Sequence, residues 1–432
     1  MTIINMPKST STIEPPTLSG LQLHIKRSLD FVVGPDGPGF MRNGPDIGHL
    51  VRLDRFVRLC LETTLEPFHI ESTMPQMAGH DALKTRRMAY RSACVKTALP
   101  NPASRDAREL ADHLRMIRAT AERFDRSDFA IKRLQCAPHI ELLLEVFSSH
   151  PISSLKGFFK VDAPVGDTGN IMAEIYNNFV TQFRCAMRDR QLLRRERHNW
   201  SSGSRENVEH LHAYLDDLFN RHGSQTVVHL RLFHSRERTN LLSSSLDDQN
   251  HDLRALRACR TVFLDRIRKK PALFTDEPRC IWAIQPSLEG GYDLHVTLLF
   301  DTAALGQVLD DIRVEVGQAG IAPEDHTDQV GAYWVKVATG GSGDYLRADR
   351  YRWLYGEDWV HGEVGADDPV RREKLKRTLG YLAMRRALVR LKDEPSGAYF
   401  GMPERKVRAP GHHANGKAKT SESVERTRPG LQ

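Results

Sequence analysis

Hydrophobic and polar residues alternate most regularly between Cys280 and Asp301, in the stretch CIWAIQPSLEGGYDLHVTLLFD. Successive side chains of a β-strand point to opposite faces, so the alternation in residues 292–300 predicts a strand with one apolar face. The apolar face holds Tyr292, Leu294, Val296, Leu298 and Phe300, and the other face holds Asp293, His295, Thr297 and Leu299. Residues 280–286 predict a second strand, and the glycine-containing turn between the two predicts a hairpin.

Other periodic segments surround this hairpin. Apolar residues at helical spacing predict helices over residues 46–65, 81–99, 103–124, 139–147, 170–199, 207–220, 254–270, 303–319 and 370–391. Two more runs predict strands, TVVHLRLFH at 226–234 and GAYWVKV at 331–337, and a glycine-rich loop follows the second. This order of elements predicts an α+β fold, in which helices pack on an antiparallel sheet.

The chain divides into four parts in this interpretation. Residues 1–20 are rich in Ser, Thr and Pro and predict a disordered lead-in, while residues 404–432 predict a disordered basic tail. Residues 21–200 predict a mainly α-helical domain of unknown role, and residues 205–403 predict the α+β domain. The boundary is placed at SSGS, residues 201–204, because serine and glycine favour loops.

Charge and cysteine content narrow the class of protein. The formal net charge of +7 favours a polyanionic partner such as DNA. The basic run Arg190–Arg197 is either a solvated helix face or a surface that contacts DNA phosphates. The six cysteines are scattered without a C-x-x-C pair, so the sequence indicates neither a zinc ribbon nor a disulfide framework and favours the cytoplasm. No apolar run reaches membrane-spanning length, and no signal peptide is predicted.

The polar face of the predicted hairpin is a candidate metal site. Asp293 and His295 are two residues apart on one strand, so their side chains point to the same side. Gln285 on the neighbouring strand lies beside them if the hairpin register allows. Two oxygen ligands and one imidazole suit a divalent cation such as Mg²⁺ or Mn²⁺. The alternative is that these residues form the solvated face of a half-buried sheet.

The helix predicted over residues 370–391 carries a candidate nucleophile. Tyr381 points away from the leucine stripe of that helix, and Lys374 and Arg385 lie on its side. Neighbouring cations favour the phenolate and can hold the phosphate that it attacks. The alternative is an ordinary boundary tyrosine with its ring half buried and its hydroxyl in water.

These stretches together resemble one family, the replication initiators of inoviruses and prophages that have a YagK/YfjJ-like C-terminal domain. The resemblance covers residues 207–403 and is carried by WAIQ (282–285), GYDLHVTLLF (291–300), YWVKVATGGSG (333–343) and GYLAMRRALVRL (380–391). The family is similar to the His-hydrophobic-His nucleases that start rolling-circle replication. The resemblance implies a rolling-circle initiator-like fold and an endonuclease that nicks single-stranded origin DNA.

In such nucleases a divalent metal polarises a phosphate oxygen, and a helix tyrosine attacks the phosphate and stays joined to the 5′ end. By resemblance, His295 matches the second histidine of the motif and Tyr381 matches the nucleophile. Three positions depart from the pattern. Asp293 stands in place of the first histidine, Gln285 in place of an acidic metal ligand, and Met384 in place of a common lysine.

The departures leave three functions open. The first is a nicking initiator that uses a metal and Tyr381. The second is a DNA-binding regulator or accessory protein of a prophage, which has the same fold and does not cleave. The third is a structural or host-interaction protein, which works through residues 21–200 and does not bind nucleic acid.

Overall fold

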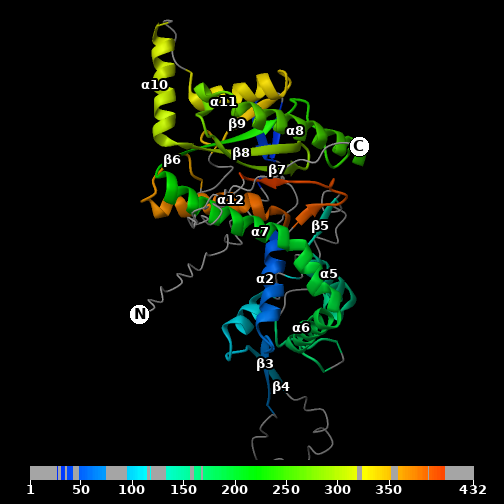
Figure 1. The fold of residues 1–432 in the computed structure, drawn as a ribbon. Helices are drawn as coiled ribbons and strands as arrows, with labels where there is room; N and C mark the ends of the chain where they lie inside the picture. Colours follow the sequence, from blue (N-terminus) through cyan, green and yellow to red (C-terminus); the bar gives the residue numbers. More distant parts are fainter. Residues whose placement is uncertain are drawn as a thin grey trace, which may run out of the picture.

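The computed structural model describes residues 27, 31–34, 37–41, 48–73, 95–113, 117, 133–155, 160–166, 169–318, 324–351, 359–387 and 389–403. The upper part in Figure 1 is a six-stranded sheet with helices above and below it, and the lower part is a smaller group of helices with the hairpin of β3 and β4. The predicted combination of helices with an antiparallel sheet is confirmed. None of the described helices is long and apolar enough to cross a lipid bilayer.

The sheet contains the three strands predicted over residues 226–234, 280–286 and 292–300. Its strand order is β10 (Gly362–Val364), β6 (Gln225–Phe233), β8 (Gly291–Asp301), β7 (Arg279–Ser287) and β12 (Phe400–Gly401), and β9 (Asp344–Arg347) also pairs with β6. In this register Asp293 lies opposite Gln285, and His295 lies opposite Arg231. Directly opposite residues share a face of the sheet, so these four side chains lie on one face.

The apolar face of β8 packs against helices, as predicted. Its core joins Leu294, Val296 and Leu298 to Leu256 and Phe263 of α8 (Leu246–Ile267). The short helix α9 (Pro271–Phe274) and the helix α11 (His326–Tyr333) lie on this side, while α10 (Thr302–Gln318) projects away from the sheet (Figure 1). The predicted contact between this face and helices is therefore confirmed.

The polar face of β8 is also covered, which contradicts the expectation of a solvated surface. The helices α7 (Gln191–His222) and α12 (Pro369–Met384) pack on it, and leucines such as Leu215 and Leu379 meet Leu299 there. As a result, Asp293 is 0% exposed and His295 is 2% exposed. Alternation of apolar and polar residues in one strand predicts which side chains share a face of the sheet. It does not predict which helices cover each face.

The lower part of the molecule is built around aromatic residues. The first hairpin, β1 (Phe31–Gly34) with β2 (Gly37–Met41), is not part of it, because Figure 1 draws this dark-blue hairpin at the level of the sheet. The lower part contains the hairpin β3 (Phe68–Thr73) with β4 (Val95–Pro100), the strand β5 (Leu134–Cys136), and the helices α2 (Gly48–Glu62), α5 (Pro138–Ser149) and α6 (Met172–Asp189). Phe56, Phe179 and Phe183 are 0% exposed in its core. A short 3-10 helix (Pro151–Ser154) follows α5.

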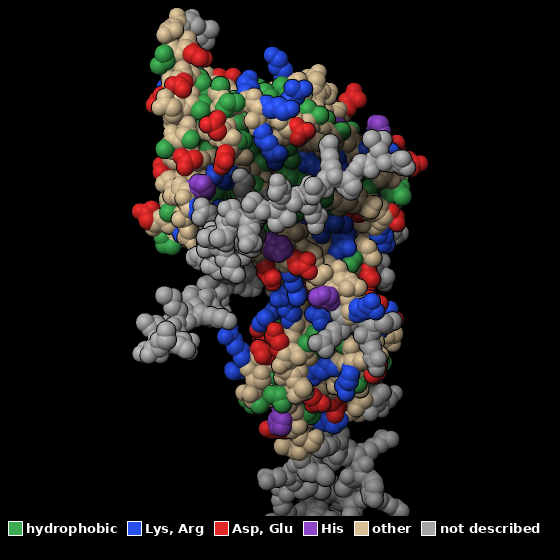
Figure 2. All heavy atoms as spheres, viewed as in Figure 1, with side chains coloured by type: hydrophobic (Ala, Val, Ile, Leu, Met, Phe, Trp, Pro, Cys, Tyr) green, Lys and Arg blue, Asp and Glu red, His purple; other side chains and the backbone are tan. Residues whose placement is uncertain are grey.

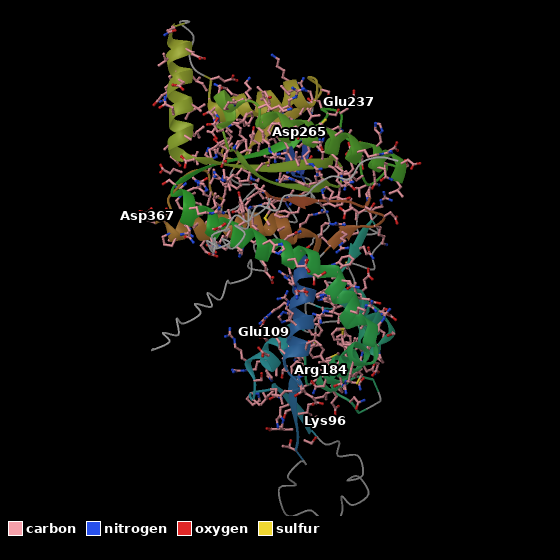
Figure 3. The ribbon with its side chains drawn as sticks, in the orientation of Figure 1. Lys96, Glu109, Arg184, Glu237, Asp265 and Asp367 are labelled. Carbon is pink, nitrogen blue, oxygen red and sulfur yellow. The ribbon has the colours of Figure 1, made fainter. Side chains whose placement is uncertain are left out.

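Polar contacts between elements hold this lower part together, and Figure 3 labels three of the residues involved. Lys96 of β4 forms an ion pair with Glu174 of α6 at 2.8 Å. Glu109 accepts a hydrogen bond of 2.9 Å from Arg55 of α2. Arg184 donates to the backbone oxygens of Cys60 and Leu65, at 2.9 Å each. Carbonyls at a helix end have no partner within the helix, so Arg184 supplies donors where α2 ends.

Several predicted elements differ in the structure. Residues 95–99 form β4 rather than the end of a helix, and residues 81–94 lie outside the described residues. Within the predicted helix 103–124, residues 105–113 are helical, and most of the remainder lies outside the described residues. The segment 201–204 is not a loop, because α7 continues through it.

The segment 331–337, predicted as a strand, is helical. It comprises the end of α11 and the π-helix η3 (Trp334–Ala338). Asp325 caps α11 by accepting a hydrogen bond of 2.9 Å from the Thr327 N–H, which starts the helix. Trp334 then donates its indole N–H to the Phe233 carbonyl at 2.9 Å and is 0% exposed. This tertiary contact outweighs the strand preference of aromatic and β-branched residues.

The helix predicted over 370–391 ends early. α12 stops at Met384 and is followed by a 3-10 turn, η5 (Arg385–Ala387), and by the strand β11 (Val389–Leu391). The strand pairs with β5 of the lower part, so residues at the C-terminal end of the prediction join the two parts of the molecule. Pairing with a segment more than 250 residues earlier cannot be read from a local period.

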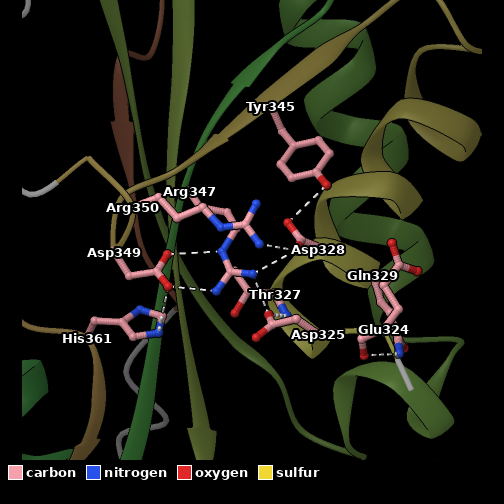
Figure 4. A network of polar contacts seen from close by, with 10 residues as sticks. All are labelled: Glu324, Asp325, Thr327, Asp328, Gln329, Tyr345, Arg347, Asp349, Arg350 and His361. Carbon is pink, nitrogen blue, oxygen red and sulfur yellow. Dashed lines mark hydrogen bonds and ion pairs between the residues drawn. The ribbon is translucent and has the colours of Figure 1, made fainter. Parts of the chain in front are cut away.

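A polar network fixes α11 to the edge of the sheet (Figure 4). Arg347 of β9 is 6% exposed and lies 2.6 Å from Asp325 and 2.8 Å from Asp328. It also donates a hydrogen bond of 2.6 Å to Asp349. Burial alone would lower the pKa of Arg347, but these carboxylates outweigh burial and raise it. The network therefore keeps a charged arginine between the helix and the strand.

Candidate nucleic-acid interface and the predicted metal site

The predicted metal ligands lie on what we term the buried polar face, which consists of His229, Arg231, Gln285, Asp293, His295 and Thr297. The strands β6, β7 and β8 supply two residues, one and three, respectively. Gln285 is 0% exposed and lies directly opposite Asp293, so it is on the face that the metal prediction requires. The sheet thus brings the three predicted ligands together on one face.

Two arginines donate hydrogen bonds to the carboxylate of Asp293. Arg231 donates through its Nε to Asp293 Oδ2 at 2.8 Å and also through its Nη2. Arg238, in the segment after β6, donates to Oδ1. The guanidinium group of Arg238 also lies 4.5 Å from the centre of the Phe233 ring. Each carboxylate oxygen is therefore hydrogen-bonded, and two positive charges surround one negative charge.

This arrangement does not fit a divalent metal. A cation at Asp293 would have to displace two guanidinium groups whose side chains are 2% and 8% exposed, and it would then face their charges at short range. Among the described residues, no three His, Cys, Asp or Glu side chains gather as metal ligands would. The observed contacts instead form a buried ion pair between Asp293 and Arg231, and Arg238 pairs with the same carboxylate.

The histidines of the buried polar face contact their neighbours in the sheet. Nδ1 of His229 lies 2.7 Å from the hydroxyl of Thr297, and its ring lies 5.7 Å from the ring of His295, centre to centre. Trp359 closes this end, with its ring edge-on and 4.5 Å from His229. The histidines are packed between the sheet and its covering segments, away from solvent.

The predicted nucleophile is also buried. Tyr381 is 3% exposed and belongs to the hydrophobic core that includes Tyr292, Val389 and Tyr399. Every residue of α12 from 378 to 383 is buried, so this turn of the helix has no solvent-facing side. Tyr381 does lie off the leucine stripe, because Leu375, Leu379 and Leu382 belong to a different hydrophobic cluster, but it faces a second core and not an open cleft.

The two predicted cations occupy different environments. Lys374 is half-buried on α12, whereas Arg385 lies beyond the end of the helix and is 1% exposed. The helical wheel placed Arg385 one turn after Tyr381 because it assumed that the helix continued to residue 391, whereas Lys374 does lie on the same helix as Tyr381. Met384, at the position of the lysine in the resembling family, is half-buried against the hydrophobic core.

Sequence reasoning missed His229, Arg231 and Arg238. A signal existed for the first two, because TVVHLRLFH alternates in the same way as β8 and places both residues on one face. Applying the period of two to β6 would have placed an arginine beside the predicted ligands once the register was known. Arg238 follows the strand and carries no periodic signal.

A second group of charges lies where α2 meets α7. We term Arg58, Arg197 and Arg205 the α2–α7 arginine cluster. The charges of Arg58 and Arg197 act on the carboxylate of Asp54, and Arg205 acts on Arg197. Oδ2 of Asp54 lies 2.8 Å from Arg58, and Oδ1 lies 2.7 Å from His139. Figure 2 shows Lys and Arg side chains gathered over this middle region of the molecule.

Electrostatics in this cluster favour an additional anion. Burial lowers the pKa of Arg197, Asp54 raises it, and repulsion from Arg205 and Arg58 lowers it further. Burial alone would raise the pKa of Asp54, but His139 and Arg58 outweigh burial and lower it. Arg58 and Arg197 thus share the carboxylate of Asp54, whereas Arg205 repels Arg197 and is exposed at the surface.

The chain was compared with family models, curated proteins and solved structures, and no match was found in any of the three comparisons.

Proposed function

We propose that this protein binds DNA and does not cleave it through the predicted residues. The observation that carries the proposal is the α2–α7 arginine cluster, in which Arg58, Arg197 and Arg205 outnumber the carboxylate of Asp54. DNA phosphates are polyanionic, and binding them releases condensed counterions. The net charge of +7 adds long-range attraction to such a partner.

The geometry of the buried polar face supports the second half of the proposal. Asp293 is engaged by Arg231 and Arg238, and Tyr381 is 3% exposed. A nucleophile must come within about 3–3.5 Å of the phosphorus in near-attack geometry. Reaching that geometry would require both a broken ion pair and an opened core. Binding without cleavage, the second of the three functions above, agrees best with these contacts.

We expect binding of single-stranded DNA to weaken steeply as salt rises, and Arg205→Gln to reduce that dependence. Each lost phosphate contact lowers the magnitude of the slope of log K against log salt by about 0.7 on single strands. Fluorescence anisotropy of a labelled oligonucleotide at several salt concentrations measures this slope.

Arg313→Gln is the matched control for Arg205→Gln. Arg313 is on α10, its side chain is 66% exposed, and it pairs with Asp310 at 2.7 Å, so its loss changes the net charge equally at a distant place. Equal slopes in the two variants would contradict a role for the cluster. Absence of binding by the unaltered protein at low salt would favour the structural or host-interaction alternative.

We expect no covalent DNA adduct when the protein is incubated with single-stranded DNA and Mn²⁺. The buried hydroxyl of Tyr381 and the engaged carboxylate of Asp293 both prevent the attack. A denaturing gel with labelled DNA detects an adduct directly. An adduct that disappears in Tyr381→Phe would overturn the proposal and establish the nicking function, whereas an adduct that persists would assign another nucleophile.

A further inference from the structure

A pocket of about 260 Å³ lies between α7, the end of α12 and the segment before β12. Its wall includes Trp200 of α7, Arg385 and Arg386 of η5, Arg390 of β11, and Tyr399 and Phe400 next to β7. None of the contacts described for the buried polar face or the α2–α7 arginine cluster involves these six residues. The pocket is smaller than the usual site for a drug-sized ligand, which occupies about 300–1,000 Å³.

Positive charge in this pocket exceeds negative charge. Glu394 is the carboxylate that the arginines share, and its side chain is 3% exposed. Arg386 donates to Glu394 Oε2 at 3.1 Å, whereas the nearest approach of Arg385 to Oε1 is 3.5 Å. Arg390 donates instead to backbone oxygens, including that of Arg386 at 3.2 Å. Three guanidinium charges therefore face one carboxylate.

Among the residues of the pocket wall, Arg385 gives the strongest indication of a bound anion. Its residue is 1% exposed, and none of its three guanidinium nitrogens makes a hydrogen bond to the described residues. A guanidinium group has five N–H donors and cannot lose its charge, so burial without acceptors is unfavourable. The hydroxyl of Tyr292, which interacts electrostatically with Arg385, is likewise buried without a hydrogen bond to the described residues. The nearest acceptor is Glu394 Oε1, which lies 3.5 Å from Arg385 and makes no hydrogen bond with it, so Arg385 has donors that a further anion could engage.

The aromatic residues of the wall are held in defined positions. The guanidinium of Arg390 lies 3.9 Å from the centre of the Trp200 ring, and that of Arg386 lies 4.3 Å from the centre of the Tyr399 ring. Trp200 also donates its indole N–H to the Ala387 carbonyl at 2.8 Å. Arginines stacked on aromatic rings form the kind of surface that receives planar bases in single-stranded nucleic acids.

We propose that this pocket binds the phosphate of a single nucleotide, with the phosphate at Arg385 and the base against the aromatic wall. A phosphate supplies the acceptor oxygens that a guanidinium fork matches in geometry. Its negative charge also balances the arginines that Glu394 does not neutralise. The small volume limits the ligand to about one nucleotide, either free or at the end of a strand. This inference does not depend on the DNA-binding proposal, because the arginines involved are different.

The test is calorimetric titration of the full-length protein with three probes: inorganic phosphate, deoxyadenosine 5′-monophosphate and deoxyadenosine. We expect the monophosphate to bind, inorganic phosphate to bind more weakly, and the nucleoside without phosphate not to bind. Equal binding of nucleoside and nucleotide, or no binding of either phosphate, overturns the proposal. A trinucleotide with and without a 5′-phosphate then distinguishes the sources: tighter binding of the phosphorylated strand than of the mononucleotide indicates a strand end, and the reverse indicates a free nucleotide.

The variant Arg385→Met assigns the binding to this arginine. Loss of hydrogen bonds to a charged group should weaken binding of the monophosphate about tenfold or more. Arg254→Gln, an exposed arginine on α8, is the control and should bind normally. An equal loss in both variants would show that only net charge matters and would overturn the proposal.

Stability separates a binding role from a structural one. If Arg385 is retained for a ligand, Arg385→Met should melt at or above the temperature of the unaltered protein in phosphate-free buffer. Arg386 still pairs with Glu394 after the change, and an apolar side chain replaces a buried charge that makes no hydrogen bond. A lower melting temperature overturns the proposal in favour of a structural arginine. If that variant does not fold, Arg386→Gln takes its place, because its side chain is 30% exposed. Weaker nucleotide binding by Arg386→Gln supports the proposal, and unchanged binding overturns it.

The two binding proposals can fail separately. Arg385→Met should leave the salt dependence of DNA binding at the α2–α7 arginine cluster unchanged. Arg205→Gln should leave binding of the monophosphate unchanged.

Discussion

Asp293→Ala should lower the free energy of unfolding by about 3–5 kcal/mol, because it removes one partner of a buried ion pair. Arg231 is 2% exposed and would keep a charge with no carboxylate beside it. Arg238 would lose the same partner. Urea denaturation followed by circular dichroism measures the change. A loss below about 1 kcal/mol would show that both guanidinium groups reach water in the variant.

The control for Asp293→Ala replaces the whole charged group. With Arg231→Met, Arg238→Met and Asp293→Leu combined, no charge is left unpaired, and the stability should return to within about 1–2 kcal/mol of the unaltered protein. A triple variant as unstable as Asp293→Ala would show that the ion pair itself, and not an orphaned charge, accounts for the loss.

Trp334→Ala should destabilise the protein by about 3–5 kcal/mol, the usual loss for a large aromatic residue removed from a core. Trp334 is 0% exposed and lies 5.5 Å from the Phe263 ring, centre to centre. Its indole N–H satisfies the Phe233 carbonyl at 2.9 Å, so the substitution removes a hydrogen bond as well as volume. The change is measured by urea denaturation.

Trp334→Phe separates the two contributions. It keeps most of the ring volume and loses the indole N–H, so it should cost only about 1–3 kcal/mol. If the phenylalanine variant is as unstable as the alanine variant, the hydrogen bond to Phe233 is the dominant contribution. A fully stable phenylalanine variant would assign the effect to packing alone.

The central hairpin could be predicted because its information is local. The period of two fixed the faces of β8, and the short glycine turn identified its partner strand. The observed register meets the condition under which Gln285 was expected beside Asp293. The contacts that decide the chemistry there are not local. Arg231 reaches Asp293 across 62 residues of sequence, and only the register of β6 brings the two together. The residues predicted to bind a metal therefore include Asp293, which forms an ion pair with Arg231 of the neighbouring strand β6.

The segments 331–337 and 201–204 show the opposite error, in which local preference was given too much weight. Aromatic and β-branched residues favour strands only where they fit a pleated, half-buried surface. Trp334 instead finds its partner on β6 from a helix. Ser and Gly favour loops, but α7 runs through them because its leucine face packs on the sheet. Helical stability in proteins comes mainly from such packing.

The family resemblance stays a prediction that the fold neither requires nor excludes. An antiparallel sheet with helices is shared by many proteins of unrelated function. The motif positions that carried the resemblance, Asp293, His295 and Tyr381, are all buried. Their chemistry could not be judged from spacing, because spacing contains no information on exposure.

The continuity of α7 has a mechanical consequence. A helix of 32 residues is about 48 Å long, and it contacts the core of the lower part at one end and the sheet at the other. Any rotation between the two parts must bend this shaft. The helix is least stable at the segment 201–204, whose sequence is SSGS. Glycine lowers helix stability by about 1 kcal/mol, and Gly/Ser pairs are common kink sites. Bending between the two parts would concentrate there, directly after Trp200 and at the wall of the pocket, which Gly203 and Ser204 line.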